Sequence, residues 1–355
     1  MRPFLPSTLP LIQAPMAGSQ GAALAIAVCK AGGLGSLPCA TLTPDQARAE
    51  ASAIRAETVA PFNVNFFCHR PPAPDAAAEA RWRAALAPYY AEAGIDPATI
   101  KAGPGRAPFD DAYCRVVEEV RPPVVSFHFG LPAPDLLARV KRTGATVLSS
   151  ATTVSEARWL EERGADAVIA QGREAGGHRG LFLSDDVEAQ PGLFALLPQV
   201  RDAVRVPVIA AGGIADGRGI AAAFALGADA VQIGTAFLRT PEATTSAVHR
   251  AALDEARDDA TRLTNLFTGR PARGLMNRVM RERGPLSDAA PAFPTAATAI
   301  TPLRASAERA GSGDFSPLWA GEAAALARDE AAGDVVRRLW DAYKTMAAGA
   351  AAVAP

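Results

Sequence analysis

Short apolar runs recur along the chain, with amphipathic stretches between them. Each run is nearly continuous in its hydrophobicity, which is typical of strands that are buried on both faces of a parallel sheet. Eight such runs are present, at residues 11–18, 33–38, 62–68, 123–130, 145–150, 166–172, 206–213 and 229–237. We therefore predict eight buried strands.

The stretches between these runs carry helix signals. In 152–165, either Thr153 or Ser155 offers the side-chain oxygen that caps the first turn of a helix, and Asp216 does the same in 215–228. A glycine follows close to the end of each stretch, as is common after a last helical turn. The sequence thus alternates strand and helix, which favours parallel strands joined by helices.

Eight strand–helix units predict an α/β fold of the closed (β/α)8, or TIM-barrel, type, which commonly needs about 250 residues. The chain has 355 residues and so leaves room for a smaller elaboration. Two segments of helical character break the alternation, 70–105 and the Ala- and Arg-rich 241–315. We predict that they form a small helical cap domain, and that the barrel comprises 1–69, 106–240 and about 316–355.

Charge and cysteine usage narrow the classes of partner. The 36 Lys and Arg residues nearly balance the 37 Asp and Glu residues, so neither nucleic acid nor an anionic membrane surface is an expected partner. Cys29, Cys39, Cys68 and Cys114 lack the spacing of a zinc site or a disulfide framework, and no metal site is predicted. The proline-rich start and the lack of an apolar window of about 18 residues predict a soluble, cytoplasmic protein.

Glycine-rich turns follow the seventh and eighth predicted strands, at the end of the barrel where ligands of such folds bind. Gly212 and Gly213 remove side chains where a phosphate approaches the backbone, and the helix that follows presents free N–H groups. Gly234 and Thr235 supply a second set of donors. We predict a phosphate site between these strands; the alternative is that the glycines serve tight turns alone.

Further candidates mark the mouths of the first and third strands. Pro15 fixes an extended backbone whose neighbouring N–H groups can face a flat ring, and Met16 can pack against the edge of that ring. A methionine of the core is an equal alternative for Met16. Asn65 alternates with apolar Val64 and Phe66, so its side chain is expected to point into the barrel or toward its mouth, where it needs a polar partner.

The stretch AQGREAGGHRG, residues 170–180, follows the sixth predicted strand. Its glycines let the loop fold close over a ligand, and His178 is expected above the barrel mouth beside the phosphate site. We therefore interpret His178 as a catalytic residue rather than an incidental loop histidine. His128 ends the fourth strand and is expected to face the mouth, whereas His69 and His249 are expected at the surface.

Taken together, these phrases resemble the nitronate monooxygenase family, formerly called 2-nitropropane dioxygenases. The matching phrases occur in order between residues 12 and 321: QAPMAG, FNVNFF, SFHFGLP, AQGREAGGHRG, PVIAAGGIADGRGIAAAFALGADAVQIGTAFL and FSPLWAG. The fourth and fifth are long and specific. The resemblance implies a TIM barrel with FMN at its top, beneath a smaller helical domain.

The same resemblance implies roles for individual residues. His178 is implied as the catalytic residue, and His128 as lining the substrate side. Contacts with FMN are implied for Ala14, Pro15, Met16, Asn65, Gln171, Gly176, Gly177, Gly212, Gly213, Gln232, Ile233, Gly234 and Thr235. The family cap tends to carry Tyr-Pro followed by Lys, where this chain has Phe293-Pro294 and Thr301. Phe293 and Thr301 are thus expected near the substrate, without the phenol and the ammonium that would hold an anion.

The implied reaction is the oxidation of an alkyl nitronate, or of a nitroalkane, by O2 with FMN, which gives a carbonyl compound and nitrite. The closest alternative is an FMN-dependent NAD(P)H reductase of quinones or enoyl thioesters, since related reductases share a similar EAGGH loop. No GxGxxG fingerprint follows a predicted strand. A non-catalytic flavin-binding protein and a flavin-free phosphosugar enzyme are further alternatives. Both a monomer and a homodimer remain open.

Overall fold

The computed structural model describes residues 4–101 and 105–353. The ends of the predicted barrel domain at 1–3 and 354–355, and positions 102–104 of the predicted cap, lie outside the described residues. Within the described ranges, no helix has both the length and the apolar character needed to cross a membrane.

Eight parallel strands form one sheet in the order β1-β9-β8-β6-β5-β4-β3-β2. The sheet closes because the N–H of Leu34, just before β2, donates to the carbonyl of Leu11 at 2.8 Å. The strands are β1 (Leu11–Gln13), β2 (Gly35–Pro38), β3 (Phe62–Phe67), β4 (Val124–His128), β5 (Thr146–Ala151), β6 (Ala167–Gln171), β8 (Val208–Ala211) and β9 (Ala230–Ile233). Each begins inside one of the apolar runs, so the predicted (β/α)8 barrel is confirmed.

Both faces of the barrel wall are apolar. Ile169 and Ile209 belong to the cluster inside the barrel, together with Leu5 from the N-terminal segment. Their neighbours Val168 and Val208 belong to a second cluster, formed with residues of the surrounding helices. Since successive strand residues face opposite sides, this arrangement explains why the runs are hydrophobic throughout rather than alternating.

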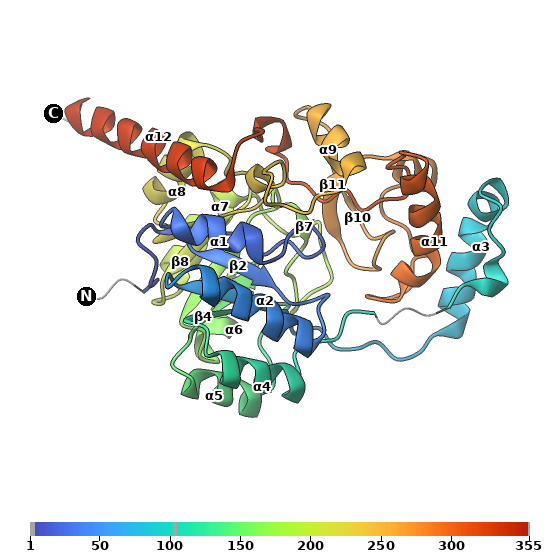
Figure 1. Ribbon diagram of the computed structural model, residues 1–355, viewed down its shortest axis with the longest axis horizontal. Helices are drawn as coiled ribbons and strands as arrows, with labels where there is room; N and C mark the ends of the chain where they lie inside the picture. Colours follow the sequence, from blue (N-terminus) through green and yellow to red (C-terminus); the bar gives the residue numbers. More distant parts are fainter. Residues whose placement is uncertain (1–3, 102–104, 354–355) are drawn as a thin grey trace.

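Helices surround the barrel (Figure 1). The helices that alternate with the strands are α1 (Ala22–Lys30), α2 (Pro44–Glu57), α4 (Asp111–Val120), α5 (Pro134–Arg142), α6 (Val154–Glu162), α7 (Leu193–Ala203) and α8 (Gly217–Ala225). Thr153 caps α6 by accepting from the N–H of Glu156, which decides between the two predicted caps. The last helix, α12 (Ala332–Val353), packs against both α8 and α1 and so completes the ring.

The cap joins two segments that are far apart in the sequence (Figure 1). It contains α3 (Ala76–Glu92), η1 (Pro97–Thr99), α9 (Ala247–Asp254), β10 (Thr261–Thr264), β11 (Ala272–Leu275), α10 (Arg278–Arg283) and α11 (Ala296–Arg309). Trp82 and Tyr90 of α3 donate to carbonyls at Ala296 and Ala299 of α11, at 3.1 and 2.7 Å. These contacts give 70–105 and 241–315 a shared core; the exact domain boundaries stay a prediction.

The sequence predicted that the segment 241–315 is helical, but the structure shows that it also contains strands. It contains β10 and β11, which pair antiparallel with each other, and β11 pairs with a two-residue strand, β7 (Gly177–His178). Arg262 is exposed between buried Thr261 and Leu263, which is the alternation of a strand. A run of four residues is too short for that period to be recognised beside longer helical stretches.

Two short 3-10 turns lie outside this segment, at η2 (Thr235–Phe237) and η3 (Ala324–Leu326).

Candidate active site

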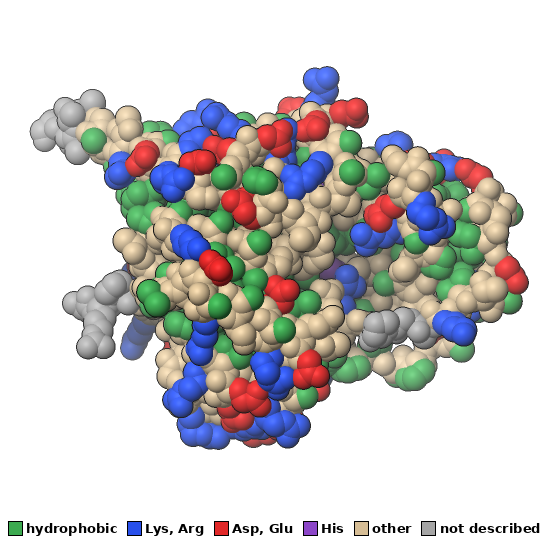
Figure 2. All heavy atoms as spheres, in the orientation of Figure 1, with side chains coloured by type: hydrophobic (Ala, Val, Ile, Leu, Met, Phe, Trp, Pro, Cys, Tyr) green, Lys and Arg blue, Asp and Glu red, His purple; other side chains and the backbone are tan. Residues whose placement is uncertain are grey.

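A large cavity lies between the carboxyl ends of the barrel strands and the cap, with an empty volume of about 1330 Å³ including its open mouth. Figure 2 shows a hollow between the two lobes, with a histidine and a basic side chain beside each other within it. Of the predicted residues, those lining it are Ala14, Pro15, Met16, Asn65, His128, Gln171, Gly176, Gly177, His178, Gly212, Gly213, Gln232, Gly234 and Thr235.

Three predicted site residues do not line this cavity. Ile233 is buried in the barrel wall, where its carbonyl accepts from the N–H of Ala14. Phe293 is buried behind His178, and the centroids of the two rings are 5.4 Å apart.

Thr301 is exposed on α11, and its hydroxyl donates to the carbonyl of Ala297, one turn earlier in the same helix. The expectation that Thr301 lies near the substrate is therefore wrong. Its place in the family pattern did not reveal which face of α11 carries it.

His69 and His249 are not surface residues as expected, since each is only 5% exposed. His69 follows β3 directly and lies under the cap, with its ring centroid 4.8 Å from that of Phe293. His249 lies on the inner face of α9. Burial lowers the pKa of each ring to about 4. Position directly after a barrel strand was a signal for His69; nothing local in the sequence marked His249.

His178 is held by the cap rather than by a free loop. It forms β7, whose residues pair with β11 in the register Ala272 to His178. Its Nε2 lies 2.9 Å from the hydroxyl oxygen of Thr268, and that hydroxyl donates to the carbonyl of Arg270 at 3.4 Å. The oxygen of Thr268 therefore accepts from Nε2–H, which leaves Nδ1 of His178 with the lone pair that can take a proton.

Burial and nearby positive charges lower the pKa of His178 well below its ordinary value of 6.5. Arg106 is the first of these charges, and Arg270 adds to the effect. The ring is thus neutral near pH 7, which is the state required of a proton acceptor.

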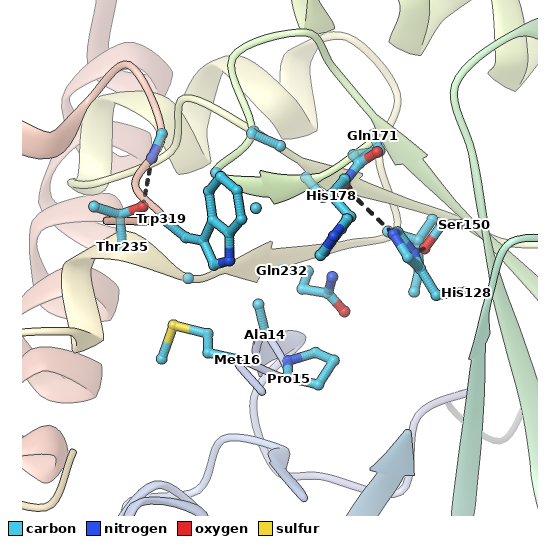
Figure 3. Close-up of a pocket in the computed structure, with 18 of the residues that line it drawn as sticks. Ala14, Pro15, Met16, His128, Ser150, Gln171, His178, Gln232, Thr235 and Trp319 are labelled. Atoms are coloured by element: carbon cyan, nitrogen blue, oxygen red, sulfur yellow. Dashed lines mark hydrogen bonds between the residues drawn. The ribbon is translucent and has the colours of Figure 1, made fainter. Parts of the chain in front are cut away.

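His128 and Gln171 fix the main chain at His178 (Figure 3). The carbonyl of His178 accepts from Nε2 of His128 at 3.2 Å and from Nε2 of Gln171 at 3.0 Å. The carbonyl can only accept, so His128 carries its hydrogen on Nε2, and its Nδ1 accepts from the hydroxyl of Ser150 at 3.1 Å. Burial lowers the pKa of His128 to about 3, so this neutral tautomer persists across the physiological range.

Arg179 is a positioning residue that the sequence did not single out. Its side chain is fully buried, and its guanidinium donates to the carbonyls of Gln171 and Gly172 at 2.9 and 2.6 Å and to Oε1 of Gln190 at 2.8 Å. These bonds tie the end of β6 to the segment that carries His178. Its position next to His178 was the available signal, but charge alone did not distinguish a buried arginine from an exposed one.

The glycine turns present unused donors to the cavity. Among the hydrogen bonds of the described residues, the N–H groups of Gly213, Gly234 and Thr235 have no acceptor. The start of α8 is already capped, because Asp216 accepts from the N–H groups of Arg218 and Gly219. This cap occupies two of the N–H groups at the start of α8, so the turns supply most of the remaining donors for an anionic group.

Gln232 presents an unused acceptor in the same cavity. Its Oε1 is buried, and no described residue donates to it. A buried polar atom without a partner costs about 1–3 kcal/mol, so the arrangement favours a ligand with an N–H group at this point. Figure 3 shows Gln232 between His178 and Pro15. Asn65, in contrast, has the expected polar partner, since its Nδ2 donates to the hydroxyl of Ser126 at 2.9 Å.

Comparison with known proteins identifies relatives that are similar over nearly the whole length of this chain. Residues 1–341 match the family model described as nitronate monooxygenase. A nitronate monooxygenase from Paraburkholderia phytofirmans is 44% identical over 340 residues, which cover 95% of this chain and 93% of the relative. The solved nitroalkane oxidase from Streptomyces ansochromogenes is 44% identical with a TM-score of 0.88, covering 97% of this chain and 98% of its own. FabK from Thermotoga maritima is 28% identical with a TM-score of 0.72, covering 99% and 97%.

Proposed function

Because the chain belongs to the nitronate monooxygenase family, as its motifs predicted, we propose that it oxidises alkyl nitronates with O2 and FMN. The products are a carbonyl compound and nitrite. The reaction balances when two nitronate ions and one O2 give two carbonyl compounds and two nitrite ions. Neutral nitroalkanes enter the same reaction after loss of the proton on the carbon that bears the nitro group.

The described residues fit FMN. The free N–H groups of Gly213, Gly234 and Thr235 suit its phosphate, and the unpartnered Oε1 of Gln232 suits an N–H at the edge of its ring system. Met16 also lines the cavity, and its thioether would pack against a flat ring held there. Bound FMN supplies the electron transfer between the substrate and O2, while the protein holds the reactants and handles the proton.

His178 is our candidate for the proton acceptor. Its ring is neutral near pH 7, and its Nδ1 is free because Nε2–H donates to Thr268. A nitroalkane gives up its proton to Nδ1, whereas a substrate that arrives as the nitronate needs no such step. Residues 70–105 and 241–315 cover the cavity in this proposal and keep bulk water from the reacting atoms.

The observation that carries the proposal is one cavity lined both by His178 and by the residues of the unused turn donors. The test is the absorption spectrum of the purified protein, followed by nitrite release from a small nitronate in air. We expect a bound flavin spectrum and nitrite in step with O2 uptake.

Two results would contradict the proposal. A colourless protein that takes up no added FMN favours the flavin-free phosphosugar enzyme. Rapid bleaching of the flavin by NADH or NADPH without O2, combined with no nitrite release, favours the reductase.

A further inference from the structure

Arg106 places a guanidinium at the wall of the same cavity as His178. It comes from the segment that leads out of the cap into α4, and its Cζ lies 6.0 Å from the ring centroid of Phe293. Among the described lining residues, Arg106 is the single lysine or arginine. Both residues line this one cavity, and the charge of Arg106 adds to burial in lowering the pKa of His178.

Within 4–101 and 105–353, the charge of Arg106 has no opposite charge paired with it. No carboxylate of the described residues forms an ion pair with it, and its guanidinium has no hydrogen-bond partner among them. The neighbouring positions 102–104 are Ala, Gly and Pro, which have no carboxylate side chain. The single carboxylate of the lining, Glu174, is engaged with the N–H of Leu193 at 2.9 Å.

A second arginine near the site, Arg270, has the protein contacts that Arg106 lacks. Arg270 donates to the carbonyl of Leu181 and lies over the ring of Phe129, with its Cζ 4.1 Å from the ring centroid. Arg106 is held less closely, since its Cζ lies 6.0 Å from the ring centroid of Phe293 and no carbonyl of the described residues accepts from its guanidinium. Arg106 is half-buried, and a partly desolvated cation without an anion is costly, which favours an anion beside it.

We propose that Arg106 is the anion-binding residue of the substrate pocket, and that it holds a small planar oxyanion beside His178. A guanidinium matches two oxygens on one atom with two parallel N–H bonds, a geometry shared by nitronates, carboxylates and nitrite. That the anion is a nitronate rests on the proposed function; the preference for such anions does not. Arg106 then selects nitronate anions over neutral nitroalkanes.

The test titrates sodium nitrite into the FMN-loaded protein and follows binding by calorimetry or by the flavin absorption spectrum. Loss of a charged hydrogen-bonding partner lowers affinity on the order of 10- to 100-fold, so we expect that loss in R106Q. R106K keeps the charge but cannot form two parallel N–H bonds, so we expect its nitrite affinity to lie between those of R106Q and the unmodified protein. R81Q, which removes an exposed arginine of α3 in the same cap, should bind nitrite like the unmodified protein.

Steady-state kinetics provide the second readout. In R106Q we expect the KM for a nitronate to rise by the same factor as the nitrite Kd, while the KM for the neutral nitroalkane changes little. A KM for the nitronate that stays unchanged overturns the proposal.

Equal nitrite affinity in R106Q and the unmodified protein, at equal flavin content and melting temperature, likewise overturns the anion site. If R106Q does not fold, R106K decides, and an unchanged affinity in R106K overturns the paired geometry. Failure of the proposed function looks different: no nitronate is oxidised, yet R106Q still loses affinity for added nitrite.

Discussion

The ring of His178 depends on a hydroxyl that lies ninety residues further along the chain, at Thr268. His178 itself was predicted from its glycine-rich loop. Thr268 was not, because the pairing of β7 with β11 brings the two together and no local pattern encodes that contact. The two arginines were missed for the same reason: arginine is typically a surface residue, and only the fold buries Arg179 and half-buries Arg106 at the cavity wall.

Replacement of His178 tests its role as proton acceptor. General-base catalysis contributes about 10²–10⁴ in rate, so H178N should lower kcat for a neutral nitroalkane by that factor and kcat for the nitronate much less. The measurement is nitrite release from the two forms of one compound, at matched flavin content. Equal and negligible losses on both forms would contradict the assignment.

Replacement of Thr268 tests the tautomer of His178. T268V keeps the shape of the side chain but removes the acceptor for Nε2–H, and a hydrogen bond of about 1 kcal/mol corresponds to a loss of roughly fivefold. We expect that loss in kcat for nitroalkanes, with nitronate oxidation unchanged. T301V is the matched control, since Thr301 is exposed and bonds only within its own helix. Identical kinetics in T268V and T301V would rule out the hydroxyl.

At the level of elements, the sequence predicted the eight strands of the barrel, because strands that are buried on both faces need continuous apolar runs. It did not predict β7, β10 and β11, which are two to four residues long. Their existence depends on partners distant in the chain, so neither period nor composition identifies them. These short strands matter for the proposed function, because β7 contains His178 and its pairing with β11 positions that residue.

The close approach of the β6–β7 loop to the segment after Trp319 gives a prediction at this scale. A Cβ at Gly176 would lie 2.5 Å from the backbone nitrogen of Gly321, so the backbone must move in G176A. We expect a free energy of unfolding lower by about 1–3 kcal/mol and weaker retention of FMN.

Urea unfolding and the flavin content after dialysis measure both effects. The control is G333A in α12, where a Cβ meets only the flexible end of Arg337 at 3.4 Å. That variant should match or slightly exceed the stability of the unmodified protein. A G176A protein as stable as G333A would show that the loop has room to adjust.

Across the whole molecule, all four histidines resist protonation in the folded state. Burial lowers the pKa of His69 and His249 to about 4, that of His128 to about 3, and that of His178 well below 6.5. The unfolded chain restores ordinary values of about 6.5 and binds more protons. The free energy of unfolding therefore falls as pH falls from about 6.5 toward 4, by about 1.4 kcal/mol per pH unit for each histidine.

Urea unfolding between pH 7 and pH 5 measures this slope. H249Q removes one titrating ring that is remote from His178. It should reduce the slope of the free energy of unfolding against pH by about 1.4 kcal/mol per pH unit, whatever the stability of the variant at pH 7. A slope in H249Q equal to that of the unmodified protein would mean that His249 titrates alike in the folded and unfolded chains.

The eighth helix position of the barrel is filled by α12, which lies beyond the whole cap in the chain. A ribosome therefore releases Ile233 of the last barrel strand roughly 5–20 seconds before it releases Ala332. During that time the seam between α8 and α1 exposes the apolar surface that Val335, Val336 and Leu339 later bury. The strands of the barrel are thus complete before the last helix that covers them, and this apolar seam stays exposed on the growing chain until α12 has been made.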